Sequence, residues 1–298
     1  MATDEVRAAV GRLVEAVEAL AAVGGAAVLR VSHVDADPEI RGALEGVVDA
    51  LGVRAAWDDA STAELAPLLP LVRTALQQAV ELVADPARAP GWSYTDVELL
   101  QSAGQASAAF PQALAERGLE HLAGLAGRLD APGASFLDVG VGVGGIAVAM
   151  CQRWPALRVV GIDPWEPALA IARRAVAAAG LEARIELRPL AVEALADEAV
   201  HDLAYVPAPF LPPAILPAAV ERVARALAPG GWLVLASYRG EGALGEAVAR
   251  LRTVRSGGTA LAAAAGEALL REVGLVDVAT LPDETWASAR LVVGRRAA

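Results

Sequence analysis

A run of apolar residues that ends in an acid is followed by closely spaced glycines. Asp138 is the acid, and the glycines are Gly140, Gly142, Gly144 and Gly145. Glycine adopts positive φ without steric cost and lets a ligand lie directly against the backbone. A helix that begins after such a turn directs unpaired amides and the positive end of its dipole to the same place. The pattern therefore predicts a strand, a tight turn and a helix that together hold a nucleotide.

These glycines satisfy two different binding patterns. Gly140, Gly142 and Gly145 fit the dinucleotide pattern G-x-G-x-x-G, whereas the spacing of Asp138, Gly140, Gly142 and Gly144 fits D-x-G-x-G-x-G. The acid distinguishes between them, because a carboxylate that faces a pyrophosphate repels it. A carboxylate beside a cation, in contrast, keeps its charge. Asp138 therefore favours a positively charged ligand.

At these residues the chain resembles the class I S-adenosylmethionine-dependent methyltransferases, whose first motif is a hydrophobic strand, an acid and this run of glycines. The resemblance continues in order through residues 129–298. It implies a Rossmann-like α/β sheet of seven strands with the last one antiparallel, S-adenosylmethionine as cofactor, and an all-α cap over residues 1–128. It also implies a set of cofactor-binding residues: Asp138, Val139, Gly140, Gly142, Gly144, Asp163, Pro164, Trp165, Ala191, Val192, Glu193, Pro207 and, with weaker support, Gln105.

Two further strands are expected beside the first. The second, Leu157 to Ile162, ends at Asp163. An acid at this place accepts hydrogen bonds from both ribose hydroxyls of an adenosine, in S-adenosylmethionine and in a dinucleotide alike. Many relatives carry an acid just beyond the third strand that takes the adenine amino group. Here the matching positions are 191–193, and only Glu193 is acidic. Glu193 as the displaced acid and Glu193 as a solvated helix residue remain equal alternatives.

The loop after the fourth strand indicates the acceptor. Relatives that methylate an adenine or a glutamine amide carry Asn/Asp-Pro-Pro-aromatic there, whereas this chain reads Pro207-Ala208-Pro209-Phe210. Pro207 has no side-chain acceptor, which disfavours that chemistry. Pro209 and Phe210 instead predict an apolar wall that suits a small organic acceptor.

Methyl transfer is an in-line displacement in which alignment and desolvation contribute most, so a strong base is not obligatory. The candidates for a base are Tyr94, His121 and Tyr205, and each is also explained as a structural residue. The downstream histidine of plant-type O-methyltransferases has no counterpart, because no histidine follows His201. We therefore assign no catalytic residue from the sequence.

Helices are expected before the sheet. Residues 4–23, 37–51 and 63–83 have helical spacing, and residues 28–34 are either a short strand or a helix end. A further helix is expected from Pro111 toward Asp130. In relatives the helices before the first strand cover the pocket, which makes a small group of residues candidates for its lining: Trp92, Tyr94, Gln101, Gln105 and Ser107. Whether the N-terminal helices form a lid or a dimer interface stays open, so a homodimer is one option.

Composition restricts the partners and the compartment. The chain has 298 residues and a formal net charge of -11, and this charge argues against binding nucleic acid. The longest apolar run, Ala19 to Leu29, is too short to cross a bilayer. No secretory signal is evident, and the single cysteine, Cys151, permits no internal disulfide. We expect a cytoplasmic protein without a metal or a membrane partner.

The sequence therefore predicts an S-adenosylmethionine-dependent methyltransferase that acts on oxygen or nitrogen of a small, fairly apolar acceptor, a specialised metabolite being one option. Two alternatives remain. One is an NAD(P)-dependent oxidoreductase, against which Asp138 and the closing strands argue. The other is a methyltransferase fold that binds the donor without methyl transfer, because fold alone does not fix function.

Overall fold

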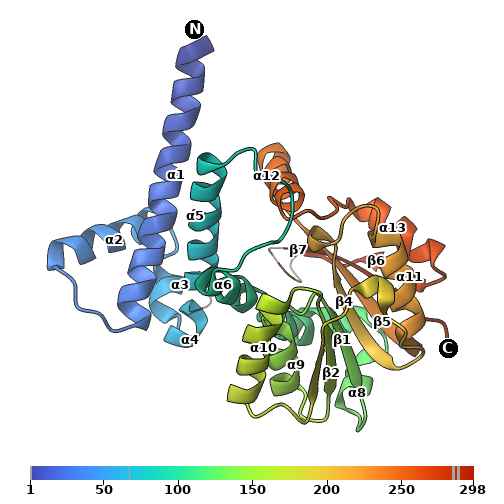
Figure 1. The fold of residues 1–298 in the computed structure, drawn as a ribbon. Helices are drawn as coiled ribbons and strands as arrows, with labels where there is room; N and C mark the ends of the chain where they lie inside the picture. The colour runs from blue at the N-terminus through green and yellow to red at the C-terminus, as the bar shows by residue number, and fades with distance from the viewer. Residues whose placement is uncertain (1, 67, 284–285, 287–288) are drawn as a thin grey trace. The chain divides into compact units, whose positions relative to one another are not determined.

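The computed structural model describes residues 2–66, 68–283, 286 and 289–298, and its contacts divide the chain into two compact units (Figure 1). These units are Met1–Ala87 and Arg88–Ala298. The segment 88–128 is thus grouped with the sheet rather than with the helices before it. This division follows the contacts between residues. The predicted boundary between the cap and the catalytic domain, between residues 128 and 129, stays a prediction.

The first unit is helical. Its helices are α1 (Ala2–Val31), α2 (Pro38–Ala50), α3 (Arg54–Asp59), α4 (Thr62–Leu65) and α5 (Leu68–Ala84). The segment 28–34, left open between strand and helix end, is the end of α1, which runs to Val31. Asp37 caps α2 by accepting hydrogen bonds from the amides of Glu39 and Ile40. Among the described residues, no helix is both long and apolar enough to span a membrane.

The second unit is built on one seven-stranded sheet. Its strands are β1 (Ser135–Val139), β2 (Arg158–Ile162), β3 (Ile185–Arg188), β4 (His201–Pro207), β5 (Leu227–Tyr238), β6 (Val276–Thr280) and β7 (Ala289–Arg295). Their order is β3-β2-β1-β4-β5-β7-β6. The pairs among β1–β5 are parallel, whereas β7 is antiparallel to both β5 and β6. The predicted fold, with its last strand antiparallel, is confirmed.

Helices cover both faces of this sheet, which explains why β1 is buried along its whole length. The helices of the second unit are α6 (Val97–Ser107), α7 (Phe110–Ala113), α8 (Leu125–Asp130), α9 (Gly145–Arg153), α10 (Glu166–Ala178), α11 (Leu216–Ala226), α12 (Gly242–Arg255) and α13 (Ala263–Glu272). Apolar residues of α7–α10 form one core with the sheet, and those of α11 and α13 form the other. Figure 1 shows α9 and α10 on the face opposite α11 and α13.

The prediction of a single helix from Pro111 toward Asp130 is wrong. Its place is taken by α7, a π-helical turn (Leu114–Gly118), a 3-10 turn (Leu119–His121) and α8. Gly124 precedes α8 with φ of 78°, a conformation that interrupts a right-handed helix. Leu114, Leu125 and Leu129 of this segment are nevertheless buried in the core that packs against the sheet.

Candidate functional site

The glycine turn joins the carboxyl end of β1 to α9. Gly140, Gly142 and Gly144 have φ of 67°, 55° and 84°, all in the left-handed region. They are the three glycines of D-x-G-x-G-x-G. Gly145 has no left-handed φ, but a Cβ there would lie 2.2 Å from the carbonyl oxygen of Gly104. The fourth glycine is therefore required by the close approach of α6.

Asp138 is the penultimate residue of β1, just before this turn, and is 1% exposed. Its Oδ2 atom has no hydrogen-bond partner, although it is buried. Burial and the nearby charge of Asp163 together raise the pKa of Asp138 to about 8, and the amide of Ala147 acts in the opposite direction. An orphaned carboxylate oxygen is costly unless a ligand satisfies it. The site is thus suited to a cationic group.

Asp163 follows β2, and its carboxylate is held by the backbone. Its Oδ1 accepts from the amide of Trp165 at 2.7 Å, and its Oδ2 accepts from the amide of Gly142 at 2.9 Å. Burial raises the pKa of Asp163, and these two hydrogen bonds act to lower it. A carboxylate oxygen can accept more than one hydrogen bond, so the fixed group retains capacity for ligand hydroxyls.

A cavity of about 500 Å³ opens at the carboxyl ends of the parallel strands, where ligands of open α/β sheets bind. Most of the predicted cofactor-binding residues line it: Asp138, Val139, Gly140, Gly142, Asp163, Pro164, Trp165, Ala191, Val192, Glu193 and Pro207. Gly144 and Gln105 are not in its lining. Gly144 instead lies against Ala172 of α10, and Gln105 is exposed. Among the described residues, no cluster of side chains suited to a metal ion is found.

Of the three candidate bases, only Tyr205 lines the cavity. It pairs with Asp138 in the β1–β4 register, so both side chains lie on one face of the sheet. Burial and the charge of Asp138 raise the pKa of Tyr205, which keeps its hydroxyl protonated at neutral pH. Tyr94 is outside the lining, and His121 ends an exposed 3-10 turn beside Glu120.

Aromatic side chains line another part of the cavity. Trp92 packs edge-on against Tyr94 at 4.9 Å and against Phe210 at 5.0 Å, measured between ring centroids. The indole Nε1–H of Trp165 donates to the carbonyl oxygen of Tyr94 at 3.0 Å. Trp92, Phe210 and Trp165 line the cavity. The hydrogen bond from Trp165 to Tyr94 links the start of the segment after Asp163 to the segment that carries Trp92.

Helix α6 and two loops supply lining that was only partly predicted. Ser107 lines the cavity as expected, whereas Gln101 is absent from the lining. Sequence reasoning missed several others: Leu100, Gly104, Leu211, Pro212, Ile215, Ser256 and Gly257. Ser256 and Gly257 follow α12 and are brought to the site by the hydrogen bond from the Gly91 amide to the Arg255 carbonyl, 3.0 Å. No local pattern in the sequence indicates such a contact.

Residues 136–231 match a family model described as a methyltransferase domain. No curated protein matches the chain with significance. Several solved structures share its fold. An O-methyltransferase family protein from Burkholderia thailandensis has a TM-score of 0.62 at 14% identity, covering 100% of this chain and 98% of its own. Human N-acetylserotonin methyltransferase in complex with S-adenosylmethionine has a TM-score of 0.64 at 11% identity, with 98% of each chain covered. The mitomycin 7-O-methyltransferase MmcR has a TM-score of 0.62 at 19% identity, with 99% of each chain covered.

Proposed function

We propose that the chain is a class I S-adenosylmethionine-dependent methyltransferase, because residues 136–231 match a methyltransferase domain and the sheet has the order β3-β2-β1-β4-β5-β7-β6. Its cavity would hold the methyl donor across the ends of β1, β2 and β3. The observation that carries this placement is Asp138, whose buried Oδ2 has no partner in the protein. The amino group of the donor would satisfy that oxygen by a charge-assisted hydrogen bond. A dinucleotide would bring a pyrophosphate to the same place, which the acid disfavours.

The nucleoside of the donor would lie between two walls. Asp163 would accept hydrogen bonds from the ribose hydroxyls, because its carboxylate is already fixed by two amides. Leu190, Ala191 and Val192 would face the adenine ring as an apolar wall. Glu193 lines the cavity but is exposed, so either predicted role remains open to it. These residues bind and orient the donor and exclude water from it.

The acceptor would occupy the aromatic part of the cavity. Trp92, Phe210 and Ile215 present apolar surface there, which supports a small, fairly apolar acceptor, with a specialised metabolite among the options. When bound, the donor supplies an electrophilic methyl group on a sulfonium that leaves as a neutral thioether. We propose transfer to oxygen or nitrogen of the acceptor, with alignment and desolvation as the main contribution of the protein.

No general base is assigned in this proposal. Tyr205 is the one candidate base in the cavity lining, and its raised pKa makes it a hydrogen-bond donor at neutral pH. We infer that its hydroxyl orients the donor or the acceptor and does not remove a proton. Tyr94 and His121 remain predictions from the sequence, and neither lines the cavity.

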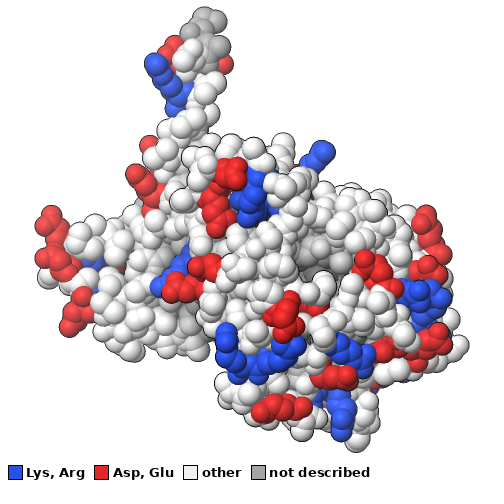
Figure 2. Space-filling view, viewed as in Figure 1, with Lys and Arg blue, Asp and Glu red and all other residues white. Residues whose placement is uncertain are grey.

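The proposed partner is a small molecule. Arginines lie among acidic side chains on the face shown in Figure 2, and the net charge of -11 supports the expectation that nucleic acid is not a partner. A cytoplasmic location and a homodimer also stay predictions.

The test is calorimetric titration of the full chain with S-adenosylmethionine, S-adenosylhomocysteine and NADH side by side. We expect binding of the first two in the micromolar range, about -8 kcal/mol, and no binding of NADH. Candidate acceptors are then screened by the mass gain of a methyl group. Binding of NADH alone would contradict the proposed donor site. Donor binding without any methylated product would favour a methyltransferase fold that binds without transfer.

A further inference from the structure

The connection between β3 and β4 departs from the usual form of a parallel crossover, which contains an α-helix. Residues 189–200 contain only a 3-10 turn, Val192–Ala194. Four of them, Leu190 to Glu193, line the proposed nucleoside wall. Because this segment contains no α-helix of its own, the position of the wall depends on contacts with other elements.

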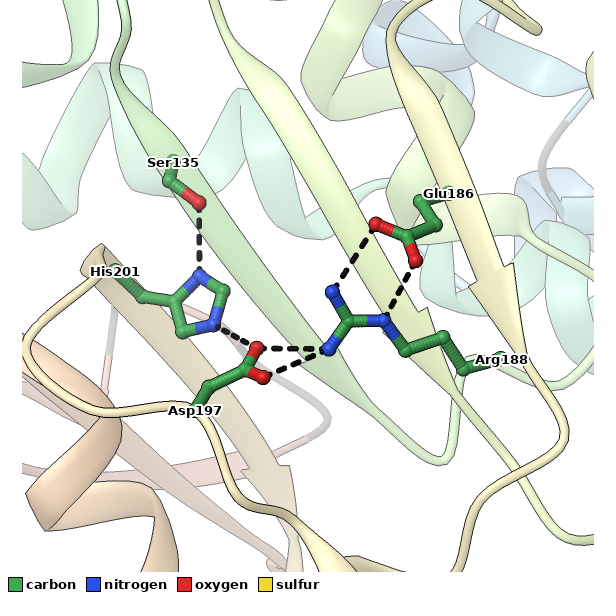
Figure 3. Close-up of polar contacts among 5 residues, drawn as sticks. All are labelled: Ser135, Glu186, Arg188, Asp197 and His201. Carbon is green, nitrogen blue, oxygen red and sulfur yellow. Dashed lines mark hydrogen bonds and ion pairs between the residues drawn. The ribbon is translucent and has the colours of Figure 1, made fainter.

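A polar network supplies these contacts (Figure 3). Arg188 Nη1 donates to both carboxylate oxygens of Asp197, at 2.9 and 2.8 Å. His201 Nε2 lies 3.0 Å from Asp197 Oδ2, and its Nδ1 lies 2.8 Å from the Ser135 hydroxyl. The other edge of the Arg188 guanidinium donates to Glu186 at 2.8 and 3.0 Å. The network thus joins β3, the connection, β4 and β1.

The contacts of this network determine the protonation of Asp197 and His201. Burial alone would raise the pKa of Asp197, but hydrogen bonds from His201 and Arg188 hold it below its usual value. Burial lowers the pKa of His201, which favours the neutral imidazole. A carboxylate beside Nε2 fixes the tautomer with the proton on that nitrogen, so Nδ1 accepts from Ser135. Every polar group between Arg188 and Ser135 then has a partner.

Serine, histidine and aspartate in contact are the groups of a nucleophilic triad, but their location excludes that role. His201 is fully buried, and neither it nor Ser135 nor Asp197 lines the cavity. His201 begins β4, whereas Tyr205, four residues later, faces the cavity, a separation of about 13 Å along the strand. A triad must contact its substrate.

The network instead closes a loop. The ion pair of Arg188 with Asp197 joins the two ends of residues 188–197, and the cavity wall lies between them. Val192 and Leu195 of this loop are buried in the core. The loop is also joined to the proposed ribose acid, because the Asp163 amide donates to the Arg188 carbonyl at 3.2 Å. A displacement of Asp197 would therefore be transmitted to the wall.

We propose that Arg188, Asp197 and His201 are positioning residues that hold the wall Leu190–Glu193 against the nucleoside of the methyl donor. This inference rests on the proposed function, since it takes the nucleoside half of the donor as the occupant. It assigns a role to His201 that is unrelated to catalysis.

The test compares two ligands, S-adenosylhomocysteine and 5′-methylthioadenosine, which has the same nucleoside but lacks the amino acid. Asp197→Asn keeps the side-chain shape and removes the charge, and Arg188→Met removes the ion pair from a side chain that is 30% exposed. Each variant is expected to bind both ligands roughly tenfold more weakly, because a displaced wall loses complementarity. Glu186→Gln is the matched control: its side chain is 60% exposed and contacts Arg188 from outside the loop. We expect it to change the affinities by less than about twofold.

Three results would overturn the inference. Unchanged affinity for both ligands in folded variants would show that the network does not position the wall. Weaker binding of S-adenosylhomocysteine alone would place the defect at the methionine half of the site. Wild-type protein that binds neither ligand would overturn the proposed function and this inference with it. Unfolding temperatures are measured for each variant, and Arg188→Met decides the result if Asp197→Asn does not fold.

Discussion

Asp138 is a buried carboxyl group whose charge depends on what occupies the cavity. Burial and the charge of Asp163 raise its pKa to about 8, so the group is largely protonated in the unliganded protein at neutral pH. A ligand ammonium beside Oδ2 favours the ionised form and lowers this pKa. Binding of such a ligand is therefore coupled to the release of a proton.

The affinity for S-adenosylhomocysteine is accordingly expected to rise as the pH approaches 8 and to level off above it. Calorimetry in two buffers with different ionisation enthalpies would measure the proton released. Asp138→Asn should bind more weakly by at least about tenfold at pH 8 and should lose the proton release. An affinity that is independent of pH in the wild type would contradict the proposed contact.

The same group affects the stability of the unliganded protein. The folded pKa of Asp138, about 8, lies above the ordinary pKa of an aspartate, 3.8, so the folded state binds more protons between these two values. The stabilisation is therefore complete below pH 4 and is lost as the pH rises through 8. Urea unfolding at a series of pH values should show this decline in the wild type. The decline should be smaller in Asp138→Asn, and an equal decline in both would refute this prediction.

Asp163 is expected to act on a different half of the donor. Asp163→Ala removes the acceptor proposed for the ribose and also frees the amides of Gly142 and Trp165. Affinities for S-adenosylhomocysteine and for 5′-methylthioadenosine should both fall by about tenfold or more. Asp138→Ala should weaken only the first by that amount. Unchanged affinities in Asp163→Ala would remove our placement of the ribose.

Helix α6 lies directly on the glycine turn. A Cβ at Gly104 would approach Val143 Cγ2 to 2.0 Å. The Gly104 carbonyl oxygen also lies 2.2 Å from the Cβ position of Gly145, the first residue of α9. Two glycines at this crossing therefore set how closely α6 covers the turn.

Gly104→Ala should destabilise the protein by about 1–3 kcal/mol through overpacking. It should also weaken binding of S-adenosylhomocysteine, because α6 supplies Leu100, Gly104 and Ser107 to the cavity. The control is Gly127→Ala in α8, where nothing lies within 4 Å of the added methyl group. That substitution should be neutral or stabilising by up to about 1 kcal/mol. Chemical unfolding and calorimetry measure both effects, and similar results for the two variants would contradict the prediction.

At the scale of the whole molecule, every residue that lines the cavity belongs to the second unit. This unit also has both cores that pack on the sheet. The apolar stripe of α1 is half exposed, with Val6, Val10 and Val14 at 62%, 52% and 49%. The cavity proposed for the donor thus has no lining from α1–α5.

A protein that comprises residues 88–298 alone is expected to fold and to bind S-adenosylhomocysteine within about threefold of the affinity of the full chain, a difference below 1 kcal/mol. Circular dichroism, thermal unfolding and calorimetry measure this. A folded second unit with a much lower affinity would show that the N-terminal helices contribute to the donor site. That outcome would favour the lid among the two roles left open for them.

Local sequence determined the parts of this protein that depend on near neighbours. Gly140, Gly142 and Gly144 are needed because their φ angles are left-handed, a property of each residue and its turn. Strands of a parallel sheet are buried on both faces, so their apolar runs were recognisable, as were Asp138 and Asp163 at the ends of two of them. The resemblance carried by these elements predicted the fold, and eleven of the thirteen residues that it implied for the cofactor line the cavity.

Only the tertiary structure decided which distant segments meet. Gly104 against Gly145, Gly91 beside Arg255, and Arg188 with Asp197 and His201 are contacts between segments whose local patterns are unremarkable. A buried histidine needs hydrogen-bond partners from other elements, and a glycine in a helix is needed where another element approaches closely. The packing of those elements fixes the distances between these residues and their partners. The sequence thus determined where a ligand can be held, and the fold decided how its walls are positioned.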